Sequence, residues 1–182
     1  MTPWHSISIK NFFLGLALCF VLAPMAQAQA PPADHPWYLG LGTGADLPGS
    51  GDDPDYYLGG GPELFGGCRM DAHWGAQLGM EEWYFAGGGT ALDDLRVLLE
   101  AKYTFEGEGL RPYLLAGPGI SFRESSPSGV NNTDFDFAVG AGLEADLGSD
   151  KHLFLEAKYN LDLAPGGSAG DVPITAGLWV GL

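Results

Sequence analysis

The residue types that carry out most enzyme catalysis are sparse in this sequence. It contains four histidines in 182 residues, and those beyond the first thirty positions are His35, His73 and His152. A nucleophile, a base and an orienting acid must come within hydrogen-bond reach of one another, and no serine, histidine and acidic residue fall into a recognisable triad. Neither a catalytic residue nor a cofactor is predicted.

A group of carboxylates, Asp52, Asp53 and Asp55, could bind a divalent cation through its oxygen atoms. The spacing lacks the D-x-D-x-D-G pattern and the closing glutamate of an EF-hand loop. Pro and Gly surround these residues, so a hydrated loop is the better interpretation, and no metal site is predicted.

Charged residues of both signs recur two positions apart along the chain. Glu100 and Lys102 form one such pair, Glu156 and Lys158 form another, and Glu144 lies in a third segment. Residues two apart point to the same side of a β-strand. Buried together, such charges can neutralise one another, so we expect structural charge pairs here rather than a path for ions.

Strands must position these residues, because apolar and polar side chains alternate over most of the chain. Leu153, Leu155 and Ala157, for example, oppose Glu156 and Lys158. Eight segments are predicted as strands: 37–46, 56–68, 72–85, 94–105, 110–123, 134–147, 152–163 and 172–182.

The connections between these strands alternate in length. Those at 47–55, 86–93, 124–133 and 164–171 are long and rich in turn formers, whereas those near 69–71, 106–109 and 148–151 are short. Alternating loops around an even number of strands are typical of an outer-membrane barrel with short periplasmic turns. The sequence predicts an all-β fold, an eight-stranded antiparallel up-and-down transmembrane β-barrel, with both chain ends on the periplasmic side.

Alternation alone does not say which face is outside, because a soluble lipocalin-type barrel alternates too. Three features favour an apolar exterior. Glycines such as Gly40, Gly79 and Gly117 crowd the polar face, as a narrow interior requires. Charges of both signs lie near strand middles. Aromatic residues lie near predicted strand ends on the apolar face, as interfacial belts do: Trp37, Tyr103, Phe105, Phe122, Phe135 and Tyr159.

The N-terminus has the features of a secretory signal peptide. Lys10 precedes an apolar run over 12–23, shorter than the ~20 residues that a membrane-spanning helix needs. Ala26-Gln27-Ala28 supplies a small-x-small cleavage site. We expect residues 1–28 to be a cleaved signal peptide, residues 29–36 a short lead-in, and residues 37–182 the outer-membrane β-barrel domain.

Composition excludes other classes of protein. The formal net charge of −15 excludes nucleic-acid binding through a basic surface. Cys68 is the only cysteine beyond the signal segment, so no intramolecular disulfide is expected. Asp93, Asp94 and Asp171 are expected to form an acidic outer surface, which could share the divalent cations that bridge lipopolysaccharide phosphates.

The last predicted strand, 172–182, ends on an apolar residue in phase with its alternation. Thr175, Gly177, Val180 and Leu182 match the polar-x-Gly-x-x-apolar-x-apolar signal of outer-membrane barrels, with leucine where an aromatic residue is commoner. We expect this strand to be recognised by the barrel-assembly machinery.

Three stretches occur in an order that resembles a known family. They are R-P-Y-L-L-A-G-P-G-I-S-F (111–122), F-A-V-G-A-G-L-E (137–144) and L-F-L-E-A-K-Y (153–159). Together they resemble the OmpA-like and opacity-protein group of small outer-membrane barrels. The resemblance spans most of residues 37–182 and implies a fold and a location, not one activity.

The sequence thus predicts a monomeric, non-catalytic outer-membrane protein of a Gram-negative cell. Its barrel would be a scaffold for four extracellular loops in envelope integrity or surface contact, with membrane lipids and lipopolysaccharide as partners. Two alternatives stay open, a narrow channel for small solutes or ions and a soluble periplasmic lipid-binding barrel. A lipid-A enzyme is disfavoured, because His73 and His152 lie near predicted periplasmic strand ends, away from the outer surface where such enzymes act.

Overall fold

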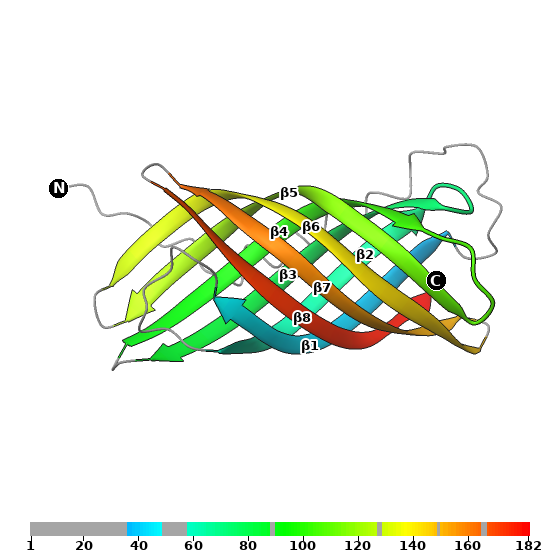
Figure 1. Ribbon diagram of the computed structural model, residues 1–182, viewed down its shortest axis with the longest axis horizontal. Helices are drawn as coiled ribbons and strands as arrows, with labels where there is room; N and C mark the ends of the chain where they lie inside the picture. The colour runs from blue at the N-terminus through cyan, green and yellow to red at the C-terminus, as the bar shows by residue number, and fades with distance from the viewer. Residues whose placement is uncertain (1–35, 49–57, 88–89, 127–128, 149, 165–166) are drawn as a thin grey trace. The chain divides into compact units, whose positions relative to one another are not determined.

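The strands close into a barrel. A computed structural model describes residues 36–48, 58–87, 90–126, 129–148, 150–164 and 167–182. This part of the chain forms eight strands: β1 (Trp37–Pro48), β2 (Gly59–Arg69), β3 (Trp74–Gly87), β4 (Thr90–Thr104), β5 (Leu110–Ser126), β6 (Val130–Gly148), β7 (Lys151–Ala164) and β8 (Gly167–Gly181). Each strand is antiparallel to the next, and β8 pairs with β1 (Figure 1). The predicted fold class is confirmed.

The β1–β8 seam joins almost all of β1 to residues 171–181 of β8. The register runs from Tyr38 opposite Gly181 to Pro48 opposite Asp171. Beyond the last strand, the Leu182 N–H donates to the Trp37 carbonyl at 2.8 Å. Closure leaves the sheet without an open edge, as hydrocarbon surroundings require. Among the described residues, no helix is long and apolar enough to cross a membrane.

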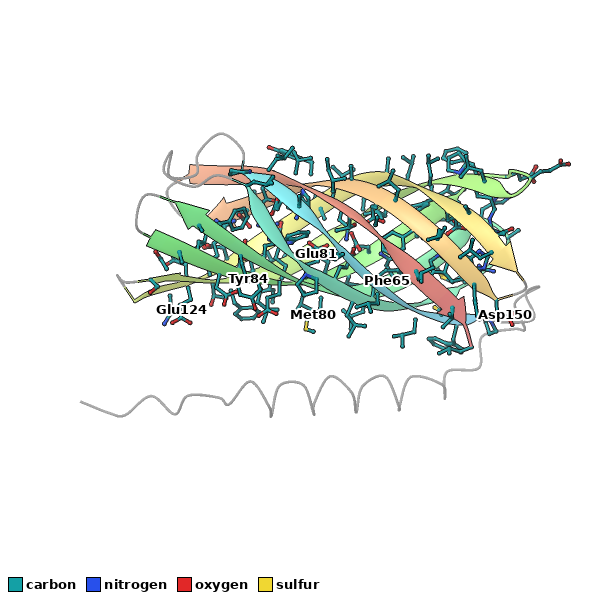
Figure 2. All side chains as sticks on the ribbon, turned by 90° about the horizontal axis from the view of Figure 1, so that it is seen from below. Phe65, Met80, Glu81, Tyr84, Glu124 and Asp150 are labelled. Carbon is teal, nitrogen blue, oxygen red and sulfur yellow. The ribbon has the colours of Figure 1, made fainter. Side chains whose placement is uncertain are left out.

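The two faces of the wall differ as an apolar exterior requires. Leu99 is 58% exposed, whereas its neighbour Leu98 is fully buried in the lumen. Figure 2 shows Met80 on the outer side of the wall, and the next residue, Glu81, lies inside. Leucine, valine, isoleucine and aromatic side chains therefore cover the outside, while carboxylates and cations fill the inside. A soluble lipid-binding barrel needs the reverse arrangement, so that alternative is wrong.

The lumen is narrow, and its glycines mark where it is tightest. A Cβ added at Gly40 would overlap the Phe65 ring, and one at Gly117 would overlap the backbone of β4. Gly79 differs, because the nearest atom to its added Cβ would be 3.9 Å away. The predicted reason for glycine on the inner face is confirmed at the first two positions but does not apply at Gly79.

Three of the four predicted long loops are wrong. The strands continue to tight hairpins, with Gly87 opposite Thr90, Ser125 opposite Val130 and Ala164 opposite Gly167. Gly, Ser, Asn and Asp dominate these stretches and imitate a loop, but they pair as strands because a backbone ladder needs no apolar side chains. The connection after β1 remains the longest, and its residues 49–57, with the aspartates at 52, 53 and 55, lie outside the described residues.

Aromatic residues mark two levels on the outer wall. We call the end where β2 joins β3, β4 joins β5 and β6 joins β7 the short-turn end. There Tyr103 contacts Trp74 and Phe105 at ring-centroid distances of 4.9 and 5.0 Å. Phe105 is level with Pro112, to whose carbonyl its N–H donates. Ten residues further along β5 lies Phe122, a spacing that fits the ~9–11 residues of a spanning strand.

Beyond Phe122 the wall continues without a membrane to cover it. The ladder between β5 and β6 goes on through Arg123 opposite Asn132 and Glu124 opposite Asn131. These pairs are polar on both faces: Arg123 binds Asp94 inside the barrel, whereas Glu124 is exposed on the outer side. The barrel therefore extends past its apolar band at the opposite end, here called the hairpin end.

Candidate functional site

One ammonium group organises the middle of the lumen. Lys158 Nζ lies 2.8 Å from Glu63 Oε1, 3.0 Å from Glu156 Oε1 and 3.8 Å from Glu100 Oε2. It also donates to Glu81 Oε1. Four carboxylates from β2, β3, β4 and β7 thus surround a single buried cation, and we call these five residues the Lys158 cluster.

A second buried cation lies nearer the hairpin end. The Arg96 guanidinium donates to Asp94 at 2.6 Å and makes a bidentate contact with Asp171. Asp136 lies 3.6 Å from its Nε and Asp46 lies 3.8 Å from its Nη1. This Arg96 cluster ties together β1, β4, β6 and β8, which are far apart in the sequence.

Carboxylates outnumber cations inside the barrel. Among the described residues the buried acids are Asp46, Asp94, Asp136, Asp162, Asp171, Glu63, Glu81, Glu100, Glu144 and Glu156, against the buried cations Arg96, Lys102 and Lys158. Both carboxylate oxygens of Asp46 and of Asp136 lack a hydrogen-bond partner, as do the amide atoms of Asn160. Buried polar atoms are normally paired, so this part of the lumen favours bound water or cations.

Aromatic rings fill the lumen between the Lys158 cluster and the short-turn end. The Phe65 ring lies 5.3 Å from that of Phe154 and 6.2 Å from that of Tyr38, and Tyr38 lies 5.3 Å from Trp179. All four are buried. They point inward because they share the alternation of the lumen carboxylates, and they exclude water from the section that they fill.

A cavity of about 250 Å³ lies at the short-turn end of the lumen. Its walls include three cations, Arg69, Lys102 and Arg111, together with Glu144 and Trp179. Glu144 lies 2.9 Å from Lys102 Nζ and 3.1 Å from Arg111 Nη2. Positive groups are thus gathered at one end of a chain whose formal net charge is −15.

The two described histidines lie at this end, as predicted. His73 Nδ1 is 3.0 Å from the Thr104 carbonyl oxygen, and His152 Nδ1 is 2.6 Å from Asp146. The His152 ring stacks on Trp179 at 3.6 Å between centroids. Within the described residues, their polar partners are a carbonyl, carboxylates and an arginine rather than a serine. His35 lies outside the described residues.

The prediction of an acidic outer surface from Asp93, Asp94 and Asp171 is wrong for two of the three. Asp94 and Asp171 are buried and bind Arg96, whereas Asp93 stays partly exposed. Asp171 was placed in a loop but belongs to β8, and Asp94, the first residue of a predicted strand, lies on the face of β4 that points into the lumen. Among the described residues, no three of the carboxylates, histidines and Cys68 are arranged to hold a metal ion.

The inward facing of the predicted charge pairs is confirmed, but their partners differ. Glu156 does pair with Lys158, whereas Lys102 of β4 binds Glu144 of β6, on the far side of β5, rather than Glu100 beside it. Arg96, Glu63 and Glu81 were not predicted as centres of clusters. Their place on the lumen-facing alternation of β2, β3 and β4 was the signal that could have found them.

The comparisons with known proteins agree with this geometry. The sequence matches the family described as the outer membrane protein beta-barrel domain over residues 14–172, and no curated protein matches it. The structure is similar to that of Neisserial surface protein A, with a TM-score of 0.68 and 16% identity, covering 80% of this chain and 96% of that chain.

Two other solved structures are similar at lower scores. The N-terminal β-barrel domain of OprF from Pseudomonas aeruginosa has a TM-score of 0.52 and 17% identity, covering 80% of this chain and 98% of that chain. The outer membrane enzyme PagL has a TM-score of 0.50 and 17% identity, covering 80% and 99%. At these identities the likeness shows the fold alone.

Proposed function

Because the chain belongs to the family of outer-membrane protein β-barrel domains, we propose that it is an integral outer-membrane protein whose barrel is a non-catalytic scaffold for surface-exposed hairpins. The observation that carries this proposal is the filling of the lumen. The Lys158 and Arg96 clusters cross it, and four buried rings occupy the section next to them. A barrel with a filled lumen serves as a rigid support for the hairpins at its ends.

In the proposed orientation the short-turn end faces the periplasm and the hairpin end faces the cell exterior. Short periplasmic turns are the rule in this class. The polar continuation of β5 and β6 beyond Phe122 supports it, because an extension surrounded by water suits the exposed side. The hairpins β3–β4, β5–β6 and β7–β8, with the connection after β1, are then the parts available for surface contact.

The proposed partners follow from the outer wall. Exposed leucines and aromatic residues at two levels fit membrane lipids and the acyl chains of lipopolysaccharide. Strand β8 carries the residues that resemble the assembly signal and would engage the assembly machinery. A barrel that is closed on itself needs no second copy, so we propose a monomer in the bacterial outer membrane.

The non-catalytic part of the proposal rests on the residues themselves. PagL is named as an enzyme, and the fold that this chain shares with it does not transfer an activity. The described histidines engage Thr104, Asp146 and other groups at the short-turn end. The buried cations Lys158, Arg96 and Lys102 are each bound by carboxylates. Such an arrangement is typical of structural ion pairs.

Single-channel recording of the folded full chain in planar bilayers tests the scaffold. We expect no steady conductance, because the rings of Phe65, Phe154, Tyr38 and Trp179 obstruct the passage. A porin recorded in the same bilayers is the positive control, and a heat-modifiability gel checks that the inserted protein is folded. Steady, reproducible current from the unmodified chain would overturn the scaffold assignment.

A narrow channel for small cations is the second candidate, and one observation favours it. The oxygens of Asp46 and Asp136 and the amide of Asn160 are buried without hydrogen-bond partners, and water in the hairpin half of the lumen would supply those partners. If that water continues past the rings, the recording gives a cation-selective current. Asp46→Asn combined with Asp136→Asn would then reduce the selectivity.

A further inference from the structure

We propose that the cavity at the short-turn end is a binding site for a small oxyanion, a phosphate or a carboxylate, held between Arg69, Arg111 and Trp179. All three residues line the cavity. They come from β2, β5 and β8, which are brought together only by closure of the barrel. The proposal concerns this cavity alone and holds whether the barrel is a scaffold or a channel.

Three nitrogen donors around the cavity have no partner. Trp179 is 3% exposed and its Nε1 makes no hydrogen bond. Arg69 Nη2 and Arg111 Nε are buried and unpartnered too. Buried donors are normally paired, so three unpaired donors on residues that line one cavity favour a ligand with acceptor atoms. An oxyanion carries several acceptor lone pairs and suits such a set.

Arg69 supplies the charge that the other cations cannot. Lys102 and Arg111 are both bound by Glu144, and Arg111 also lies 3.0 Å from Asp146. Arg69 makes no ion pair within the described part of the chain, and its guanidinium carbon lies 4.8 Å from the Trp179 ring centroid. Stacking against the indole holds the guanidinium in place while leaving its N–H groups to a ligand.

The charge of the cavity also favours an anion. Arg69, Lys102 and Arg111 contribute three positive charges to the lining, and Asp71 and Glu144 contribute two negative charges. Asp146, which lies 3.0 Å from Arg111, offsets the third, so among the described residues Arg69 is the cation of this cavity that no carboxylate pairs with. The whole chain carries −15. A protein of this net charge repels anions at long range. The cations of the cavity can therefore attract an anion only at short range, once it is inside the cavity.

Size restricts the class of ligand. A volume of about 250 Å³ holds about eight water molecules at ~30 Å³ each and falls below the ~300–1,000 Å³ of sites for drug-sized molecules. Inorganic phosphate or a short carboxylate fits with some water. The same phosphate chemistry could come from a lipid headgroup that reaches the barrel mouth, and the experiment must separate these two sources.

The Trp179 indole N–H is the natural reporter for this site. We would titrate the folded full chain, labelled with ¹⁵N at tryptophan in zwitterionic micelles, with inorganic phosphate and follow the indole signals, assigned with Trp179→Phe. The Trp179 signal should move saturably. The Trp83 indole, which donates to Glu81 at 3.0 Å deep in the lumen, should stay in place and serves as the internal control. Chloride at matched ionic strength should leave both signals unchanged.

Two variants test the role of Arg69. Arg69→Gln removes the free cation and should weaken phosphate binding about tenfold or more, because hydrogen bonds to charged groups are strong. Lys151→Gln removes the same charge from an exposed position at the same end and should change the affinity less than about twofold. An unchanged Trp83 signal and a heat-modifiable band show that each variant is folded.

Nanodiscs separate the two sources of phosphate. In phosphate-free buffer, a shift of the Trp179 signal in phosphatidylglycerol discs but not in phosphatidylcholine discs identifies a lipid headgroup as the source. A shift produced only by added phosphate or acetate identifies a free anion. The proposal is overturned if neither source moves the Trp179 signal, if chloride moves it equally, or if Arg69→Gln binds phosphate as well as the unmodified chain.

Discussion

At the scale of single residues, Lys158 matters most, because four carboxylates depend on it. Removing one member of a buried ion pair leaves an uncompensated charge, whereas removing an exposed charge has little effect. The same contrast exists within β7 itself, since Lys151 at its start is exposed and Lys158 is buried. The strand therefore offers a matched pair of lysines for measurement.

Lys158→Met should lower the free energy of unfolding by about 3–5 kcal/mol, because it leaves the Glu63, Glu81, Glu100 and Glu156 carboxylates facing one another. Lys151→Met should have an effect near zero. Urea unfolding in micelles, followed by tryptophan fluorescence, measures both. Equal effects would mean that the lumen is wet enough to solvate single charges, which would favour the channel.

Gly79 and Gly117 both face the lumen but differ in the space around them. Gly79→Ala should be tolerated or stabilise the protein by up to about 0.4–1 kcal/mol, because alanine restricts the unfolded chain and finds room in the folded one. Gly117→Ala should destabilise it, since its methyl group would meet the β4 backbone. The comparison uses the same urea titration, and the reverse order would contradict the close packing described for the lumen.

Asp71, in the turn after β2, gives a pH dependence with a definite sign. The N–H groups of Trp74 and His73 donate to its carboxylate at 2.7 and 2.8 Å and lower its pKa. A lowered pKa stabilises the fold above the unfolded pKa of about 3.9, and this contribution is lost as the pH falls through the folded pKa. Asp71→Ala should therefore destabilise the hairpin at neutral pH, and the difference from the unmodified chain should shrink on acidification. A difference that is constant with pH would assign the effect to something other than the charge.

At the scale of elements, the depth of a residue in the apolar band determines how much a charged side chain on the outer face destabilises the barrel. Val139 pairs with Ala116 and Tyr159 near the middle of the wall, whereas Leu163 pairs with Phe135 at the aromatic level toward the hairpin end. Val139→Arg should destabilise the barrel by about 2–4 kcal/mol and Leu163→Arg by about 0–1 kcal/mol. Unfolding in lipid vesicles measures both. Equal costs would mean that the apolar band does not end near Phe135.

The membrane explains which parts of the strands could be predicted. Within the band each strand has one face in lipid and the other in the lumen, so its residues alternate, as Leu153 to Lys158 do, and the pattern locates all eight strands. Past Phe122 the residues on both faces are polar, the apolar–polar alternation disappears, and the sequences of β5 and β6 look like a loop. Partners across the lumen were not predictable either, because contacts such as Lys158 with Glu63 depend on tilt and register rather than on sequence spacing. The cavity depends on the β1–β8 seam for the same reason.

At the scale of the whole molecule, closure depends on the last strand finding the first. Leu182→Asp should reduce the heat-modifiable, protease-resistant fraction in isolated outer membranes, because it puts a charge at the end of the β8 apolar face, where Leu182 is 65% exposed. Leu182→Phe should insert as well as the unmodified chain or better. Its backbone bond to Trp37 survives both substitutions, so equal insertion of Leu182→Asp would mean that the side chain plays no part in assembly.

Because most basic side chains point into the lumen, the charge on the outer surface of the protein differs from the charge of the whole chain. Arg96, Lys102 and Lys158 are buried, and Arg69, Arg111 and Arg123 are half-buried, so among the described residues Lys151 is the one basic side chain left exposed. The described surface therefore carries few basic side chains, although the ten buried carboxylates, set against three buried cations, also keep part of the negative charge inside the barrel. Trypsin, which cleaves after exposed lysine or arginine, finds a single accessible site in this part of the folded chain. Away from the cavity at the short-turn end, polyanions meet almost no positive charge and are expected to bind only where divalent cations bridge them to the carboxylates.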